Sequence, residues 1–343
     1  MEPLCVSYDP ALGCHDLKIA GRGETTDVLF YGTNERLESL AKDIELVGCT
    51  EAKVIITGET GTGKTTLARA IHLRHEKRGA HRFRRTNVGA LVPELAASQL
   101  FGHKEGAFTG ATRDHVGIVE ASDRGTFFMD EISAASDTVQ VMLLTLLETQ
   151  IVNKVGAGPA DKPTKVDVRF MAATTQPLNV LRDSKTFRTD LFFRLAEYHI
   201  AIPPLREHRE EIPVLAHTAL VGCQKTHRTG CTPLLRIDDA ALKRLEAYGW
   251  PGNVRELQSV IRAAVVRSRE YPRETVLRAK YLRFHMEGKS NRNRFDEQQS
   301  WPEAKDAFQR SWVNEALERC GTAAEVGRRY GIDQKTIRKY RSD

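Results

Sequence analysis

Cysteine is sparse in this sequence, and its few cysteines do not form a disulfide framework. Six cysteines are spread over 343 residues without a CxxC pair. Small secreted proteins held by disulfides have a denser and more regular set, so the scattered cysteines predict reduced thiols, as in the cytoplasm. Cys223, His227 and Cys231 have a spacing that resembles part of a zinc site. No fourth ligand lies near them in the sequence, and we therefore expect no zinc there.

Long apolar segments and a secretory signal are also missing. The most apolar helix-like run, Val139–Leu147, is far shorter than the roughly 20 residues needed to cross a membrane. The N-terminus, MEPLCVSYDP, lacks the basic region followed by an apolar one that marks a signal peptide. We therefore expect a cytoplasmic protein with no membrane partner.

The charge balance is moderately basic. The chain has 51 Lys and Arg against 45 Asp and Glu, which gives a formal net charge of +6. Such a balance permits nucleic-acid binding without establishing it. At roughly 100–200 residues per domain, the length predicts two or three domains.

Strand-like and helix-like segments alternate from Tyr31 to about Pro204. This alternation predicts a parallel sheet flanked by helices. Beyond it the pattern becomes helical, with Asp238 and Asn253 at positions where we expect helix N-caps. Residues 1–28 have no sustained periodicity and are interpreted as a short leader. We expect strands at 53–57, 125–130, 166–172 and 198–202, and helices at 64–74 and 139–148.

The stretch GETGTGKT, residues 58–65, follows the apolar segment VIIT and precedes a helix. It satisfies GxxxxGK[ST] in the context that this phosphate-binding motif requires. The glycines let backbone N–H groups turn toward phosphate oxygens, and the helix N-terminus adds its dipole. Lys64 is expected to neutralise the β/γ-phosphates, and Thr65 to offer a hydroxyl to Mg²⁺. The predicted nucleotide-binding residues of this loop are Gly58, Glu59, Thr60, Gly61, Thr62, Gly63, Lys64, Thr65 and Thr66.

A second element, GTFFMDEI at 125–132, is an apolar strand that ends in two carboxylates. We expect Asp130 to hold Mg²⁺ and Glu131 to orient and polarise the attacking water. Adjacent acids at the end of an apolar strand are costly unless a metal or water uses them. A capping role for the following helix is the alternative. Together the two motifs predict an ATPase that uses ATP and Mg²⁺.

Between these motifs lies GAFTGA, residues 106–111, whose glycines are unsuited to a helix or strand. With this hexapeptide, the chain resembles the bacterial enhancer-binding proteins, which are AAA+ ATPases that activate sigma-54 RNA polymerase. The resemblance runs from about Gly32 to Val266. It rests on QLFGHKEGAFTGA, FRTDLFFRL (187–195), PPLREHREEIP (203–213) and YGWPGNVREL (248–257).

The resemblance implies an AAA+ P-loop fold with an α-helical lid, and roles for further residues. Arg188 and Arg194 would act in trans on the nucleotide of a neighbouring subunit, and Arg255 would relay nucleotide state to the lid. Asn87 would hold Glu131 away from water, and Thr174 would donate a hydrogen bond toward phosphate. The residues implied to contact sigma-54 are Gly106, Ala107, Phe108, Thr109, Gly110 and Ala111, with Phe108 exposed and Thr109 supporting it.

Three positions depart from the family pattern. Thr65 stands where the family usually has Glu, Arg124 replaces a usual glycine, and Thr175 stands where Asn is common. None of these changes removes a catalytic group. We therefore expect an active enzyme with an altered rate or altered coupling.

The C-terminal stretch TAAEVGRRYGIDQKTIRKY, residues 322–340, predicts a helix, a glycine-containing turn and a second helix. Ala324, Val326 and Ile332 are expected in its small core, and Asp333 is expected to cap the second helix. The segment resembles the Fis-type helix-turn-helix of this family, and a helix at 303–319 is expected to pair subunits. The residues expected to contact DNA in the major groove are Gln334, Lys335, Thr336, Arg338 and Lys339.

These predictions divide the chain into five segments. They are a leader at 1–28, an AAA+ α/β ATPase subdomain at 29–205, a helical lid at 206–270, a basic linker at 271–300 and a helix-turn-helix domain at 301–343. Because only about 28 residues precede Tyr31, the resemblance is to short members without an N-terminal regulatory domain. Such members are controlled by a separate regulatory protein or by their own abundance.

The expected function is that of an ATP-hydrolysing transcription activator. It would bind upstream enhancer DNA, assemble from dimers into a hexameric ring, alone or with a homologous subunit, and remodel the sigma-54 polymerase closed complex. One alternative is an AAA+ remodeller of a different target, which would not need GAFTGA. A second is a non-enzymatic DNA-binding repressor, but Glu131 argues against it because pure sensing needs no residue that activates water.

Overall fold

The computed structural model describes most of the chain in two compact units, 1–283 and 284–343. The described residues are 6–9, 14–19, 28–32, 34–227, 230–284, 309, 312, 313, 317, 322–331 and 333–340. The expected pairing helix at 303–319 therefore lies largely outside the described residues. Among those described, no helix is both long and apolar enough to cross a membrane.

A parallel sheet of five strands forms the centre of the first unit, with the strand order β12-β4-β11-β8-β5. The expected α/β architecture is therefore confirmed. One edge strand, β5, was not predicted, because its charged and largely exposed residues lack the apolar pattern of a buried strand. The strands are β4 (Val54–Thr57), β5 (Phe83–Asn87), β8 (Thr126–Asp130), β11 (Arg169–Thr174) and β12 (Tyr198–Ala201).

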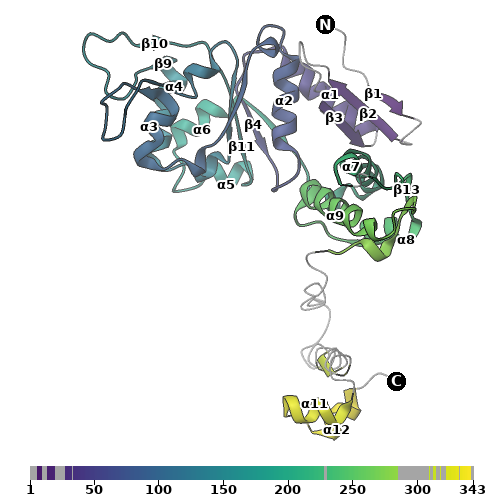
Figure 1. Ribbon diagram of the computed structural model, residues 1–343. Coiled ribbons are helices and arrows are strands. Elements are labelled where there is room, and N and C mark those ends of the chain that lie inside the picture. Colours follow the sequence, from purple (N-terminus) through teal and green to yellow (C-terminus); the bar gives the residue numbers. More distant parts are fainter. Residues whose placement is uncertain are drawn as a thin grey trace. The chain divides into compact units, whose positions relative to one another are not determined.

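Helices cover both faces of this sheet, and Figure 1 shows α1 and α2 on one side and α3, α4 and α6 on the other. Strand side chains alternate between the two faces, so Phe127 packs in the α4 cluster and Phe128 in the α2 cluster. Burial on both faces explains why the inner strands are almost entirely apolar. The helices are α1 (Asn34–Gly48), α2 (Lys64–Arg74), α3 (Pro93–Phe101), α4 (Asp137–Thr149), α5 (Leu178–Arg182) and α6 (Thr189–Leu195).

Smaller antiparallel sheets accompany the main sheet. Residues 1–28 were interpreted as a short leader without sustained periodicity, but two strands lie within them. These strands, β1 (Val6–Asp9) and β2 (Cys14–Ile19), form a sheet with β3 (Val28–Gly32). The segments are too short to show a period; β1 pairs with β2, and β2 pairs with β3. The other pairs are β6 (Gly102–His103) with β7 (His115–Val116), and β9 (Ile151–Val152) with β10 (Thr164–Lys165).

Three helices form the lid, namely α7 (Ile212–His227), α8 (Asp239–Ala247) and α9 (Asn253–Arg267). Asp238 caps α8 as expected, because its carboxylate accepts a hydrogen bond from the Ala241 N–H. The predicted N-cap at Asn253 is wrong. Gly252 occupies the cap position, and the Asn253 side chain bonds elsewhere. The short strands β13 (Arg236–Ile237) and β14 (Val276–Leu277) pair in parallel, so part of the expected linker at 271–300 folds with the lid.

The second unit contains α11 (Ala323–Tyr330) and α12 (Gln334–Tyr340). Gly331 ends α11 with a φ of +68°, and Asp333 accepts a hydrogen bond from the Thr336 N–H, as the sequence predicts. Ala324 was expected in the core but is exposed, because the helix turns Ala323 inward instead. Ile332 lies outside the described residues. Among the residues described in this unit, the buried side chains of the small core are Val313, Val326, Ile337 and Tyr340.

Arg124 stands where the family that the sequence resembles usually has glycine, and it has a φ of +60°. This left-handed conformation costs about 1 kcal/mol for a residue with a side chain. Its N–H donates to the Asp167 carbonyl oxygen at 2.8 Å, which holds the turn before β8 in place. The substitution therefore acts on backbone conformation rather than on the chemistry of a site.

A buried histidine links α2 to the sheet. His72 is 2% exposed, accepts a hydrogen bond from the Thr126 hydroxyl at Nδ1, and donates from Nε2 to the His81 carbonyl oxygen. Burial lowers the pKa of His72 from 6.5 to about 4. Both ring nitrogens have hydrogen-bond partners in one neutral tautomer, so the folded protein disfavours protonation of the second ring nitrogen.

We expect the free energy of unfolding to fall as the pH is lowered from about 6.5 to 4. In this range the unfolded chain binds a proton at His72 and the folded chain does not, so acid favours unfolding. The pKa difference corresponds to a loss on the order of 3 kcal/mol. Urea unfolding across this pH range measures the effect, and the non-titrating variant His72→Asn should lose this part of the slope. Equal slopes for the two proteins would contradict the assignment.

Candidate active site

The loop between β4 and α2 forms one wall of a polar cavity. Gly61 and Gly63 have φ values of +84° and +103°, which glycine adopts without strain. A Cβ atom at Gly61 would lie 2.3 Å from the Gly252 carbonyl oxygen, so the lid approaches too closely for any side chain there. Lys64 Nζ donates to the carbonyl oxygens of Gly58 at 2.6 Å and Glu59 at 3.0 Å. Burial lowers the pKa of Lys64, while Glu131 and Asp130 oppose that shift.

The cavity has a volume of about 450 Å³ and contains most of the residues that the sequence assigned to nucleotide binding. Gly58, Glu59, Thr62 and Thr174 belong to the surrounding structure rather than to its lining. Sequence reasoning missed Arg85, Val254 and Gln258. The lining residues are Thr60, Gly61, Gly63, Lys64, Thr65, Thr66, Arg85, Asn87, Asp130, Glu131, Val254, Arg255 and Gln258.

Asp130 ends β8 and Glu131 follows in a left-handed conformation, with a φ of +55°. The turn directs the Glu131 carboxylate to Thr175, whose hydroxyl donates to it at 2.8 Å and whose N–H donates at 3.3 Å. The Ser133 hydroxyl donates to the same oxygen at 3.2 Å. Thr175, one of the three departures from the family pattern, therefore holds the carboxylate expected to activate water.

Asn87 and Thr174, both expected to act near the phosphates, have local partners. The Asn87 side chain accepts a hydrogen bond from the Gly89 N–H at 3.1 Å, although Asn87 also lines the cavity beside Glu131. Thr174 is buried, and its hydroxyl oxygen accepts from the Gln176 N–H at 3.0 Å. The geometry thus places Asn87 at the site while Thr175 makes the contact with Glu131.

Oxygen donors suited to a hard divalent cation meet in this cavity. Asp130 supplies a carboxylate and Thr65 a hydroxyl, and both line the same space as Lys64. Mg²⁺ in phosphate sites is typically held by one or two carboxylates together with hydroxyl, water and phosphate oxygens. The residues present therefore fit Mg²⁺ bound with a nucleotide.

Asn253 joins the lid to the phosphate loop through a fully buried amide. Its Nδ2 donates to the Thr60 carbonyl oxygen at 3.0 Å and to the Glu59 carboxylate at 3.2 Å. Its Oδ1 accepts from the Leu205 N–H at 2.8 Å. Because Val254 and Arg255 follow directly, this anchor brings the first turn of α9 into the cavity.

Arg206 makes a second contact with the same loop. Its guanidinium donates two hydrogen bonds to the Glu59 carboxylate, at 2.8 and 2.7 Å. The hydrogen bond from Arg206, followed by that from Asn253, lowers the pKa of Glu59. Both partners of this ion pair are more than 40% exposed, so water screens it strongly.

We expect Asn253→Ala to lower the free energy of unfolding by about 3 kcal/mol, because it removes a buried amide that satisfies several backbone and carboxylate groups. Part of the loss comes from backbone strain, since Asn253 has a φ of +52°. Asn253→Gly relieves that strain and should recover about 1 kcal/mol. Arg206→Ala, which removes a screened contact, should cost clearly less than Asn253→Gly. Urea unfolding compares the three variants, and wild-type stability in Asn253→Gly would contradict an anchoring role.

Arg188 and Arg194 lie outside this cavity and pair with acids on exposed surfaces. Arg188 donates two hydrogen bonds to Asp190, at 3.1 and 2.8 Å, and Arg194 donates to Glu148 at 3.2 Å. Each arginine side chain is about half exposed. The folded chain therefore does not bring either arginine to its own cavity.

The GAFTGA segment forms an exposed loop between β6 and β7. Backbone hydrogen bonds close it, from the Gly106 N–H to the Ala111 carbonyl oxygen at 2.8 Å and from the Ala111 N–H to the Phe108 carbonyl oxygen at 3.0 Å. Gly106 and Gly110 have φ values of +78° and +101°. The Phe108 side chain is 41% exposed and meets the His103 ring edge-on at 5.0 Å. The loop thus presents an aromatic side chain on the surface.

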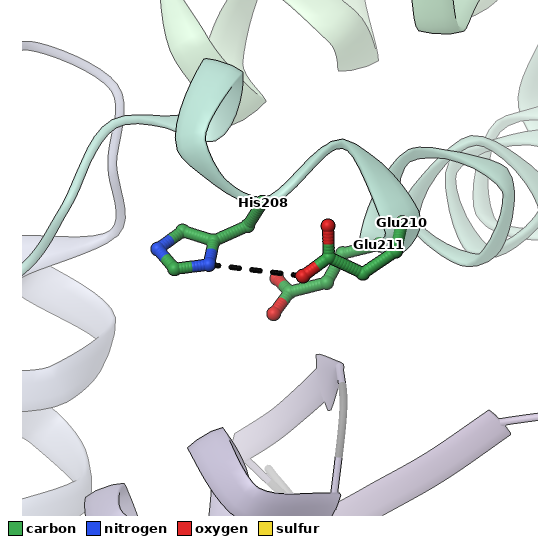
Figure 2. Close-up of side chains that lie close together, drawn as sticks. All are labelled: His208, Glu210 and Glu211. Atoms are coloured by element: carbon green, nitrogen blue, oxygen red, sulfur yellow. Dashed lines mark ion pairs between the residues drawn. The ribbon is translucent and has the colours of Figure 1, made fainter.

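A histidine and two acids gather where the lid begins. Figure 2 shows His208 beside Glu210 and Glu211, with Nδ1 of His208 3.9 Å from the Glu210 carboxylate. One ligand-type atom from each of the three residues lies within 4.8 Å of the others. This cluster is outside the cavity lining. In the described part of the chain, Cys223, His227 and Cys231 form no comparable group.

Family models match two adjacent parts of the chain. The Sigma-54 interaction domain matches residues 30–201, and the AAA+ ATPase lid domain matches residues 206–299. These ranges contain the phosphate loop, the acids of β8, the GAFTGA loop and the lid helices. The boundary between the matches falls in the segment that carries Leu205 and Arg206, where the lid joins the sheet.

Individual proteins resemble the chain over the same region. Regulatory protein AtoC of Escherichia coli K12 is 40% identical over 227 residues, which cover 66% of this chain and 48% of AtoC. The hydrogenase transcriptional regulatory protein HoxA of Bradyrhizobium diazoefficiens is 43% identical over 221 residues, which cover 64% and 44% of the two chains. The chain spans about half the length of these curated relatives.

The fold also matches solved structures. NtrX from Brucella abortus in complex with ADP aligns with a TM-score of 0.68 and 26% identity, over 92% of this chain and 68% of that chain. NtrX in complex with ATP aligns with a TM-score of 0.66 and 27% identity, over 91% and 68%. The chain belongs to the sigma-54-dependent activator family and carries the AAA+ ATPase domain of that family with its helical lid.

Proposed function

We propose that this protein hydrolyses ATP and uses the energy to remodel the sigma-54 RNA polymerase closed complex during transcription activation. The observation that carries the proposal is that a complete phosphate loop with two strand-end acids and an exposed GAFTGA loop belong to one α/β unit. A remodeller of a different target needs the first feature but has no use for the second. The match to the Sigma-54 interaction domain supports the proposal that sigma-54 is the target.

Different cavity residues bind the phosphates, activate water and hold the metal. Lys64 leaves the Gly58 and Glu59 carbonyl oxygens to bind the β- and γ-phosphates, and Glu131 orients and polarises the attacking water. Mg²⁺, when bound at Asp130 and Thr65, supplies positive charge for the phosphoryl oxygens. Asn87 and Thr175 limit the positions that the Glu131 carboxylate adopts, and Arg255 reports the state of the cavity to the lid.

A continuous path connects the cavity with the GAFTGA loop. Asn87 caps the short helix at 88–90, and a Cβ atom at Gly89 would lie 2.5 Å from the Ala134 Cβ, in the turn that follows Glu131. Helix α3 then leads from this tight contact to β6 and the loop. We infer that rotation of the Glu131 turn shifts α3 and so changes the exposure of Phe108.

The test is capture of sigma-54 by the purified chain in the presence of ADP and aluminium fluoride, which mimics the transferring phosphate. We expect a complex on size-exclusion chromatography that requires the mimic and is lost in Thr109→Ala. Thr112→Ala, an exposed threonine just beyond the hexapeptide, is the matched control and should keep the complex. If ATP turnover persists without any complex, the chain remodels a different target.

A ring of subunits is part of the proposal, because Arg188 and Arg194 lie on exposed surfaces away from their own cavity. A neighbouring subunit would receive one of these guanidinium groups beside its γ-phosphate, where it stabilises the developing charge. The proposed assembly is a homo-oligomer, from dimers to a hexamer, or a ring with a homologous subunit.

Arg194→Ala should retain nucleotide binding and lose most ATP hydrolysis. Lys64→Ala should lose both, because its own cavity no longer binds the phosphates. In a mixture of the two proteins, a Lys64→Ala subunit donates Arg194 to an intact neighbouring site, so we expect turnover to recover partly. A phosphate-release assay on mixtures of different ratios measures this, and activity that stays at the sum of the two single variants would exclude action in trans.

Binding to upstream DNA is assigned to the second unit. Helix α12 exposes Gln334, Lys335, Arg338 and Lys339, while the Thr336 hydroxyl donates to Asp333 at 2.6 Å and supports the cap. Side chains of these types suit base edges and phosphates of a major groove. We propose residues 301–343 as the DNA-binding domain and a separate protein, or the abundance of this chain, as its control.

A further inference from the structure

The cavity contains a basic side chain for which the mechanism above has no role. Arg85 donates two hydrogen bonds to Oδ2 of Asp130, from Nε at 3.0 Å and from Nη2 at 2.5 Å. The Asp130 side chain is 14% exposed and the Arg85 side chain 47%. A protein cation thus contacts the carboxylate on which the divalent cation would depend.

Sheet register explains why Arg85 reaches this carboxylate. In the parallel pairing of β5 with β8, Arg85 lies opposite Phe128 and Asn87 lies opposite Asp130. Residues two apart on a strand share a face, so Arg85 and Asn87 both point to the side of α2 and the phosphate loop. Arg84 points to the opposite face and does not line the cavity. It is a matched control at the neighbouring position.

The charges around the cavity decide what happens when a metal ion arrives. Lys64, Arg85 and Arg255 line it together with two carboxylates, Asp130 and Glu131. A divalent cation and a guanidinium on one carboxylate oxygen repel each other, so the two compete for Asp130. Arg85 is half exposed on a long side chain and can swing away. Once displaced, it still lines the cavity that would hold the nucleotide, and a guanidinium binds phosphate oxygens at two points.

We propose that Arg85 is a positioning residue that holds Asp130 until a divalent cation binds there, and that it then contacts the nucleotide phosphates within the same subunit. The inference rests on the proposed nucleotide site. It makes two predictions of opposite sign. Arg85 weakens the binding of a divalent cation alone, because the cation must displace it, and it strengthens the binding of nucleotide without metal.

The experiment measures these two affinities separately on the full chain. Mn²⁺ alone is titrated by electron paramagnetic resonance, and ATP is titrated by calorimetry in the presence of EDTA. Arg85→Ala should bind Mn²⁺ about three- to tenfold more tightly and metal-free ATP about three- to tenfold more weakly, as expected for a half-exposed charged contact. Arg84→Ala should change neither affinity by more than about twofold.

Two further variants test whether the effect on Mn²⁺ arises at Asp130 and whether the positive charge of Arg85 is what ATP binding needs. Adding Asp130→Asn to Arg85→Ala should abolish the gain in Mn²⁺ affinity, because the gain comes from that carboxylate. Arg85→Lys keeps a positive charge but loses the two-point contact, so it should retain most of the ATP affinity and release Asp130 partly. Thermal unfolding midpoints establish that the variants are folded.

The outcomes separate the inference from the proposed function. If Arg85→Ala is less stable but keeps both wild-type affinities, the pair is only a structural ion pair and the inference is wrong. If both affinities fall together, Arg85 orients Asp130 for metal rather than competing with it, which also overturns the inference. If the wild-type protein binds no ATP with or without Mg²⁺, the proposed function fails, and the inference fails with it.

Discussion

The amide of Asn253 is the contact on which the shape of the cavity depends. It bonds the phosphate loop at Thr60 and Glu59 and the start of the lid at Leu205. The same contact requires that Gly61 have no side chain, because the lid backbone passes 2.3 Å from where its Cβ atom would be. This buried group therefore couples the position of the lid to the conformation of the phosphate loop, and the exposed ion pair of Arg206 with Glu59 is a second contact between them.

Four charged groups of the cavity, Lys64, Arg85, Asp130 and Glu131, have partners within the protein. Lys64 bonds two carbonyl oxygens of its own loop, Asp130 bonds Arg85, and Glu131 bonds Thr175 and Ser133. A buried charge without a partner would be costly, so these contacts stabilise the charged groups in one arrangement. A nucleotide that binds with its metal would then replace these protein partners rather than find charged groups without partners. Catalysis benefits from such prearranged charges because little reorganisation is left for the reaction itself.

The GAFTGA loop is organised differently, because its contacts are mostly backbone hydrogen bonds and one aromatic pair. Gly106 and Gly110 have no atoms near the place of a Cβ, so they serve backbone conformation rather than close packing. Phe108 rests against His103 with its ring edge-on and stays partly exposed. Few contacts hold this loop, and a surface loop of this kind can change conformation without disturbing the core.

The sequence predicts the nucleotide site through short motifs. The phosphate loop and the acids of β8 are runs of consecutive residues whose chemistry and local geometry coincide, so spacing alone predicts them. The α/β architecture followed from the alternation of strand-like and helix-like segments. The sequence does not predict contacts between residues that are far apart along the chain. Arg85 is 45 residues from Asp130, and Asn253 is 194 residues from Glu59.

Tertiary structure decided the residues whose roles depend on such contacts. The local sequence pattern predicts Asn253 as an N-cap. In the folded chain its side chain instead hydrogen-bonds the phosphate loop at Thr60 and the backbone at Leu205. Arg85 lies on an edge strand that lacks an apolar pattern, and only its register with β8 aims it at Asp130. The sequence by itself determined the chemistry of the phosphate loop and its acids, because adjacent residues suffice for it. The fold determined what holds those groups in place, because their partners come from distant parts of the chain.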